Sequence, residues 1–213
     1  MTVRNWAEEY EEGISAMGEV SERMYYCYDC VRFLPPLEGR LPRIDLPLRT
    51  SVIRYEGEVS GKTTGCHLPL LAQPAQHFLL KDTPPFHAQS TVLVYPEAGA
   101  PSLANFLAER TSPLESVVFL DCKWTQGQGM RRHPNLASLP GIQLSTDNQT
   151  QFWRPQGRSR PASFLATIEA VYYFFREYSA ITGKPSPQEL PNILLIYDFL
   201  HRKIFHRPFQ FPQ

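Results

Sequence analysis

The residues best suited to chemistry are Asp121 and Trp124, which follow the apolar run 116–120. A carboxylate at the end of a buried strand can accept a proton or orient a substrate amide, and partial desolvation raises the pKa of a carboxylic acid toward a useful range. Taken alone, the pair is more typical of a capping aspartate followed by a core tryptophan. Its meaning therefore depends on the elements around it.

Short apolar runs along the chain predict the elements that position this pair. Strands are expected at 43–56, 91–96, 116–121 and 193–197, a strand or hairpin at 142–153, and helices at 1–26, 103–110 and 163–178. Alternating strands and helices favour an α/β fold with a mainly parallel sheet. Ligands bind at the carboxyl ends of such strands, where Asp121 and the Tyr95-Pro96 turn both fall. After Asp121 we expect a loop through Gly127 and Gly129.

Charge is balanced over the whole chain but segregated along it. The 213 residues carry 21 basic and 21 acidic side chains, which argues against a histone-like polyanion binder. Residues 1–22 nevertheless hold six glutamates, and residues 127–168 hold five arginines against one aspartate. These arginines are Arg131, Arg132, Arg154, Arg158 and Arg160. The cluster indicates phosphate contacts, with a solvated loop face as the alternative.

The cysteines and the lack of a long apolar run limit the classes of protein to which the chain can belong. Cys27 and Cys30 have metal-knuckle spacing, but two ligands do not complete a zinc site, and Cys66 and Cys122 are distant. We expect an acidic extension with this knuckle at residues 1–40 and the main domain at 41–213. Few, scattered cysteines suggest a nuclear or cytoplasmic protein, and the chain has no long apolar run for a membrane span.

Several segments, taken in order, resemble the DTW-domain family. Residues 119–126 are similar to its strand-D-x-T-W-x-Q segment, and His133–Leu136 with Leu139-Pro140 are similar to its N-P-x-L-x-x-L-P stretch. The aromatic-x-Arg element is matched by 152–154, the S-T-x-E-A helix start by 163–170, and the Thr loop by 62–64. The resemblance spans roughly residues 24–200. The aromatic residues in segments 25–30 and 169–174 are most similar to the eukaryotic branch of the family, which acts on the tRNA D-loop.

The resemblance implies transfer of the 3-amino-3-carboxypropyl group of S-adenosylmethionine to N3 of a tRNA uridine, at D-loop position 20. It also implies a SPOUT-related knotted domain. Asp121 would be the base, and Trp124 would stack on the uracil or the adenine. The implied cofactor-binding residues are Tyr95, Pro96, Leu120, Ala166, Thr167, Ile168 and Glu169. Free N–H groups at the helix start would hold the methionine carboxylate. The implied RNA-binding residues are Lys62, Lys123, Arg131, Arg132, Arg154, Arg158 and Arg160, and any zinc would use Cys27 and Cys30.

The chain departs from the family at Lys123, where the motif has threonine. A lysine there would point toward phosphate, pair with Asp121 and lower its pKa, or mark a weakened enzyme. The alternative functions are therefore an inactive RNA-binding or assembly module and another S-adenosylmethionine-dependent RNA modification, such as methylation or an rRNA target. The sequence does not predict the oligomeric state.

Overall fold

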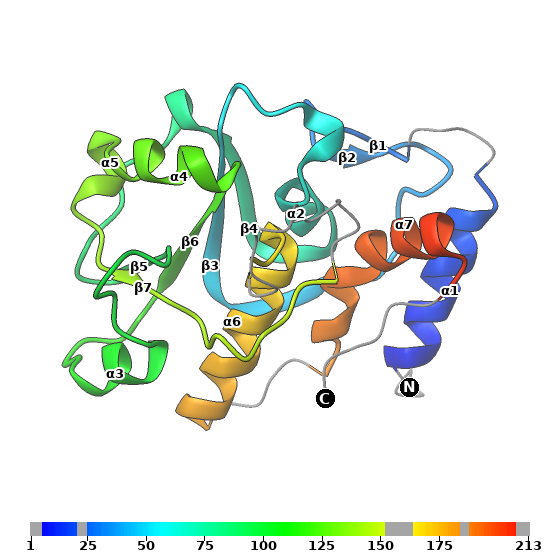
Figure 1. Cartoon of the computed structure of the whole chain (residues 1–213). Coiled ribbons are helices and arrows are strands. Elements are labelled where there is room, and N and C mark those ends of the chain that lie inside the picture. The colour runs from blue at the N-terminus through cyan, green and yellow to red at the C-terminus, as the bar shows by residue number, and fades with distance from the viewer. Residues whose placement is uncertain (1–5, 21–24, 152–163, 184–187, 208–213) are drawn as a thin grey trace.

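The computed structural model describes residues 6–20, 25–151, 164–183 and 188–207. Its centre is a parallel five-stranded sheet in the order β4-β3-β6-β5-β7 (Figure 1). The strands are β3 (Ile44–Arg54), β4 (Ala72–Leu79), β5 (Thr91–Val94), β6 (Ser116–Asp121) and β7 (Gly141–Ile142). This confirms the predicted α/β fold with a mainly parallel sheet. The predicted knot stays a prediction.

Helices and short turns surround this sheet. The α-helices are α1 (Trp6–Gly18), α2 (Leu68–Leu71), α3 (Leu103–Ala108), α4 (Trp124–Arg131), α5 (Pro134–Ala137), α6 (Thr167–Thr182) and α7 (Leu195–Phe205). Four 3₁₀ turns span Ser60–Lys62, Gly65–His67, Leu80–Asp82 and Leu190–Leu194. A small antiparallel hairpin, β1 (Tyr26–Cys27) and β2 (Arg32–Phe33), stands apart from the main sheet.

The middle of the sheet is buried on both faces. Strand β6 is almost entirely enclosed, as expected for a central parallel strand rich in valine and phenylalanine. Helix α6 packs against it, and Phe119 meets Phe174 edge to face at a centroid distance of 5.7 Å. Gly183 ends α6 in the left-handed conformation (φ 65°), which glycine adopts without steric cost. The core therefore fixes the C-terminal end of β6 relative to the start of α6.

The N-terminal helix is anchored to the C-terminal helix. Tyr10 donates a hydrogen bond of 3.0 Å to Asp198 of α7, and Arg202 of α7 binds both Asp198 and Glu11. Figure 1 shows α1 and α7 side by side, at the opposite end of the molecule from β7. Buried side chains of the first 40 residues, including Leu37, belong to the same hydrophobic cluster as α7. The extension expected at 1–40 thus shares a core with the rest of the chain.

Three sequence-based expectations were wrong. The apolar run 193–197 forms the end of a 3₁₀ turn and the start of α7, not a strand. A short apolar run has no periodicity that separates a buried strand from a buried helix. The expected loop at Gly127 and Gly129 is helix α4. Of the strand or hairpin expected at 142–153, the described residues place only Ile142 in a strand, with an isolated bridge at Gln143. Strand β4 was not predicted, because Gln73, Pro74 and Gln76 interrupt its apolar pattern.

No helix among the described residues has both the length and the apolar character needed to span a membrane.

We predict that Tyr10→Phe lowers the free energy of unfolding by about 1–3 kcal/mol, because the fully buried Asp198 loses a hydrogen-bond donor. Urea denaturation measures the change. Glu8→Gln, on an exposed position of the same helix, should leave the unfolding midpoint where it is. Equal midpoints for the Tyr10 variant and the wild type would show that this hydrogen bond does not hold α1 in place.

Candidate functional site

A cavity of about 370 Å³ opens at the C-terminal ends of β5 and β6. Its size falls within the range of about 300–1,000 Å³ typical of small-molecule sites, and its position follows the rule for parallel sheets. Five segments line it: the ends of β5 and β6, the start of α4, the chain after β7 and the start of α6. The lining residues are Val94, Tyr95, Pro96, Phe119, Leu120, Cys122, Trp124, Gly127, Gln143, Leu144, Ser145, Thr146, Phe164, Leu165, Thr167 and Ala170.

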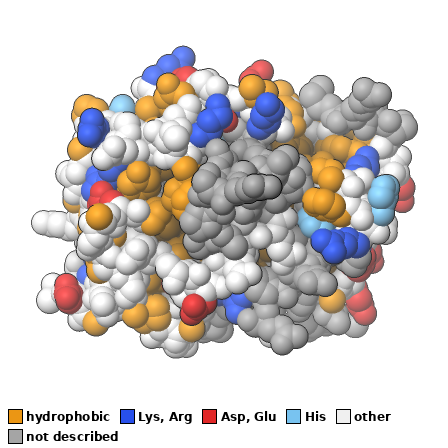
Figure 2. All heavy atoms as spheres, viewed as in Figure 1, with side chains coloured by type: hydrophobic (Ala, Val, Ile, Leu, Met, Phe, Trp, Pro, Cys, Tyr) orange, Lys and Arg blue, Asp and Glu red, His pale blue; other side chains and the backbone are white. Residues whose placement is uncertain are grey.

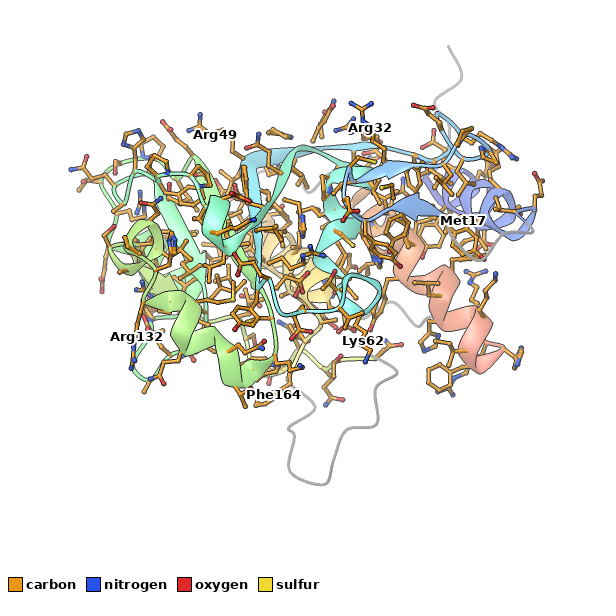
Figure 3. All side chains as sticks on the ribbon, turned by 90° about the horizontal axis from the view of Figure 1, so that it is seen from above. Met17, Arg32, Arg49, Lys62, Arg132 and Phe164 are labelled. Carbon is orange, nitrogen blue, oxygen red and sulfur yellow. The ribbon has the colours of Figure 1, made fainter. Side chains whose placement is uncertain are left out.

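One wall of the cavity is a stacked aromatic pair. The rings of Trp124 and Phe164 lie 3.9 Å apart at 19° to each other, although the two residues are far apart in sequence. Trp124 remains 39% exposed. Figure 3 shows Phe164 at the outer edge of the molecule, near the start of α4. The pair forms a flat apolar surface that suits the face of a heterocyclic base.

Tyr95 forms a second part of the lining, and a glycine makes room for it. A Cβ atom on Gly127 would lie 2.7 Å from Cε2 of the Tyr95 ring, so only glycine allows α4 to approach β5 this closely. Burial raises the pKa of Tyr95, and nearby Cys122 and Glu97 add to the shift. The phenol therefore stays protonated near neutral pH and can donate a hydrogen bond into the cavity.

Asp121 lies at the junction of three segments and is not among the lining residues. Its carboxylate accepts a hydrogen bond of 3.0 Å from the Gly65 N–H and one of 2.8 Å from the Thr167 hydroxyl. The residue is only 6% exposed, and a Cβ on Gly65 would come within 2.5 Å of Oδ2. These contacts fix Thr167, which does line the cavity. The geometry makes Asp121 a residue that positions the site.

The protein itself binds one N–H group in the first turn of α6 and the N–H of the residue before the helix. The Ile168 N–H donates to the Thr64 hydroxyl at 3.3 Å, and the Ala166 N–H donates to the Glu169 carboxylate at 2.8 Å. The Ile168 N–H is therefore not free for a ligand carboxylate, and the binding of that carboxylate at the helix start otherwise stays a prediction. Of the four residues predicted at this helix start, Thr167 reaches the cavity, while Ala166, Ile168 and Glu169 shape the turn beneath it.

Two glutamates of α6 hold the segment 143–151 as another wall. Glu169 also accepts hydrogen bonds from the Thr150 hydroxyl and the Gln151 N–H, and Glu177 accepts from the Ser145 N–H and from Asn148. Burial raises the pKa of Glu169, and its hydrogen bonds oppose that shift. Sequence reasoning missed this wall. Its only signal was two glutamates eight positions apart on one helical face.

Lys123 forms an ion pair with Glu58, at a distance of 3.5 Å between Nζ and Oε1. The lysine side chain is 58% exposed, whereas the glutamate lies beneath it. The backbone N–H of Lys123 donates to Gln126, which starts helix α4. Sequence reasoning had offered Asp121 as a partner for this lysine. The structure instead brings in Glu58, which had not been singled out.

The predicted RNA-binding residues separate into three groups. The guanidinium of Arg131 donates hydrogen bonds to the carbonyl groups of Leu136 and Leu139. Because these bonds stabilise the fold, the proposed RNA surface does not include Arg131. Lys62, Lys123 and Arg132 are exposed. Figure 3 shows Lys62, Arg132 and Phe164 along one side of the molecule. Arg154, Arg158 and Arg160 lie outside the described residues.

The cysteine pair lies at the tip of the small hairpin. The Cys27 pKa is lowered by hydrogen bonds from the Cys30 backbone and thiol. Among the described residues, no group of three or more His, Cys, Asp or Glu side chains is placed to hold a metal ion. Cys66 is buried instead beside Thr63 and Tyr26. The metal role of Cys27 and Cys30 stays a prediction.

The fold and the cavity together place this chain in the class of parallel α/β domains with a candidate small-molecule site at the strand ends. The DTW domain profile matches residues 24–205, and the chain therefore belongs to the DTW domain family. This confirms the resemblance seen in the sequence.

Curated relatives carry the name tRNA-uridine aminocarboxypropyltransferase 1. The Xenopus laevis protein is 29% identical, over 86% of this chain and 77% of its own length. The proteins of Mus musculus and Homo sapiens are each 28% identical, over 85% of this chain and 74% of their own length. No solved structure gives a significant match.

We predict that Gly127→Ala destabilises the protein, because the added methyl group would force the Tyr95 ring to move. Gly129→Ala is the matched control on the same helix, with no described atom within 4 Å of its Cβ. That variant should gain about 0.5–1 kcal/mol of stability from the higher helix propensity of alanine. Thermal melts compare the two. A Gly127 variant as stable as the Gly129 variant would contradict the close packing of α4 on Tyr95.

Proposed function

We propose that this chain transfers the 3-amino-3-carboxypropyl group of S-adenosylmethionine to N3 of a tRNA uridine. The observation that carries the proposal is the cavity at the ends of β5 and β6, which gathers Tyr95, Trp124 and Thr167 from separate motifs of a DTW-family chain. The names of the curated relatives support the same reaction. Bound S-adenosylmethionine supplies a sulfonium that makes its γ-carbon electrophilic.

The residues present suit that donor. The Trp124–Phe164 surface offers a stacking face for adenine, and aromatic rings also attract a sulfonium cation. Hydroxyl groups of Ser145, Thr146 and Thr167 border the same cavity and can bond to ribose or carboxylate oxygens. Tyr95, Pro96 and Leu120 line the strand ends. In this proposal the chain contributes position and exclusion of water, the main requirements for joining two bound substrates.

Exposed basic residues near the cavity form the proposed RNA surface. It comprises Lys62, Lys123 and Arg132, and Arg154, Arg158 and Arg160 stay predicted members. Figure 2 shows Lys and Arg side chains along the upper part of the face that also exposes hydrophobic side chains at its centre-left. Phosphate contacts of this kind supply affinity and register, while the cavity selects the base.

The modified uridine and the cellular location are further parts of the same proposal. A D-loop uridine at position 20 is supported by the likeness of residues 25–30 and 169–174 to the eukaryotic branch. A nuclear or cytoplasmic location is proposed from the sparse cysteines alone. Lys123 favours the second candidate, an inactive RNA-binding module. Its ion pair with Glu58 weakens that case, because the lysine is accommodated while Asp121 keeps its bonds to Gly65 and Thr167.

Nucleoside mass spectrometry of tRNA incubated with the protein and S-adenosylmethionine tests the reaction. We expect uridine carrying an aminocarboxypropyl group at N3. Parallel reactions use donor labelled in the methionine chain or in the methyl group, and only the first label should enter the tRNA. Methyl label alone would establish methylation instead. The absence of both donor binding in calorimetry and any product would support the inactive module.

We predict that Lys62→Ala and Arg132→Ala each weaken tRNA binding and reduce the salt slope of log K by about 1, because one phosphate is no longer neutralised by the protein. Arg32→Ala is the control, since Arg32 is exposed on the opposite side of the molecule in Figure 3. Filter binding over a salt series gives both quantities. If Arg32→Ala matched the other two variants, the basic surface would have to lie elsewhere.

A further inference from the structure

Thr167 connects a buried carboxylate to the cavity. Its side chain lines the cavity, and its hydroxyl donates a hydrogen bond of 2.8 Å to Oδ1 of Asp121. Asp121 is 6% exposed and is not a lining residue itself. A threonine hydroxyl has one proton and two lone pairs, and an ionised carboxylate can only accept. Because the Thr167 proton is used in the bond to Asp121, the hydroxyl offers the cavity an acceptor.

The fold holds this pair in place before any ligand arrives. The second carboxylate oxygen of Asp121 accepts a hydrogen bond of 3.0 Å from the Gly65 N–H. The residue after Thr167 is fixed as well, since the Ile168 N–H donates to the Thr64 hydroxyl at 3.3 Å. Both residues of the pair are therefore tied to the turn at 64–65. A ligand that uses the acceptor of Thr167 meets a preorganised group.

The cavity wall at Thr167 is negative. None of the described lining residues is Lys, Arg, His, Asp or Glu, so the charge reaches the cavity from the layer behind it. Burial raises the pKa of the Cys122 thiol in this wall to about 12, and the charges of Asp121 and Glu58 add to the shift. A buried carboxylate acts through a medium of low dielectric, so its attraction for a cation is stronger than that of a carboxylate in water.

Ser145 offers a useful comparison on the opposite wall. Its hydroxyl also donates to a carboxylate, that of Asp147, at 3.3 Å. Both of these residues are exposed, whereas Asp121 is buried. Water and salt screen the Asp147 charge, so it has little effect on a ligand in the cavity. Of the two hydroxyl–carboxylate pairs, the one at Thr167 is the better site for a cation.

A cation that carries N–H groups fits this wall best. Hydrogen bonds with an ionised partner are roughly twice as strong as those between neutral groups, so an ammonium is favoured there over a ribose hydroxyl. S-adenosylmethionine has two cationic groups. Its sulfonium has no N–H group, whereas its α-ammonium has N–H groups to donate. The α-ammonium is the group that matches both the acceptor and the charge.

We propose that Thr167, supported by Asp121, binds the α-ammonium group of the donor. This inference rests on the proposed transfer reaction. The ammonium donates to Oγ1 of Thr167, and the hydroxyl donates in turn to Asp121, so one residue bridges the two opposite charges. The γ-carbon belongs to the same short chain as the ammonium. Holding the ammonium therefore restricts where the γ-carbon lies and favours attack at that carbon over attack at the methyl group.

Calorimetry with three adenosyl ligands tests the site on the full chain. S-adenosylmethionine carries both the ammonium and the carboxylate, its decarboxylated form keeps the ammonium, and 5′-methylthioadenosine has neither. Thr167→Val should weaken binding of the first two by about 10–100-fold, the effect of losing one hydrogen bond to a charged group. Binding of methylthioadenosine should stay unchanged. Thr167→Ser keeps the hydroxyl and should bind all three ligands nearly as the wild type does.

Two further variants give the controls. Asp121→Asn removes the charge but keeps a hydrogen-bond acceptor, and it should weaken the same two ligands. It also provides the test if circular dichroism shows that Thr167→Val does not fold. Ser145→Ala is the matched control, because it removes a lining hydroxyl whose carboxylate partner is exposed. It should leave the ratio of the S-adenosylmethionine and methylthioadenosine affinities as in the wild type.

Several results would overturn the proposal. An equal loss for all three ligands would assign Thr167 to the ribose or to the fold. A loss for S-adenosylmethionine alone would assign it to the donor carboxylate. Unchanged affinities in folded Thr167→Val would exclude any contact with the ligand. Wild-type protein that binds methylthioadenosine as tightly as S-adenosylmethionine would have no site for the ammonium at all.

The binding pattern also separates this site from the reaction. Methyl transfer, or no transfer to any tRNA, together with the expected pattern would refute the proposed function and leave the ammonium site standing. Transfer of the aminocarboxypropyl group without the pattern would refute only the role of Thr167. Wild-type protein that binds none of the three ligands would refute both.

Discussion

The buried carboxylate of Asp121 is the group on which the site depends. It joins the end of β6 to the Gly65 turn and to Thr167 at the start of α6, three segments far apart in the chain. A carboxylate this buried is stable only when donors reach it, so its charge requires these segments to meet. Gly65 has to lack a side chain for the meeting to occur. The cavity beside Thr167 follows from this junction.

Other carboxylates organise the remaining walls in the same way. Glu169 gathers Thr150, Gln151 and Ala166, and Glu177 holds the segment at Ser145, so both fix irregular backbone along α6. Each of them is used to satisfy backbone N–H groups that would otherwise lack partners. Glu58 differs, because it is buried yet its Oε1 holds no backbone segment among the described residues.

The sequence predicted some parts of the structure well, for identifiable reasons. Residues 116–121 were predicted as a buried strand because valine and phenylalanine are enclosed on both faces there. The apolar stripe of α6 is longer than any strand in the described chain, so its helical period was clear. The run 193–197 was too short to show a period, and in the structure it belongs to a 3₁₀ turn that packs against α6 and to the start of α7. Arg131 and Arg132 look alike in sequence, but Arg131 is the one that faces carbonyl groups.

By itself the sequence determined the family, the strands that carry its motifs and some of the residues that line the cavity, such as Tyr95, Trp124 and Thr167. Such information is local, because each motif and each apolar run consists of consecutive residues. The tertiary structure alone decided which carboxylate is satisfied and which is left open. It also gave Lys123 its partner Glu58, from a segment more than sixty positions earlier. Hydrogen bonds and ion pairs act over a few ångströms, so they depend on folded distance and not on sequence spacing.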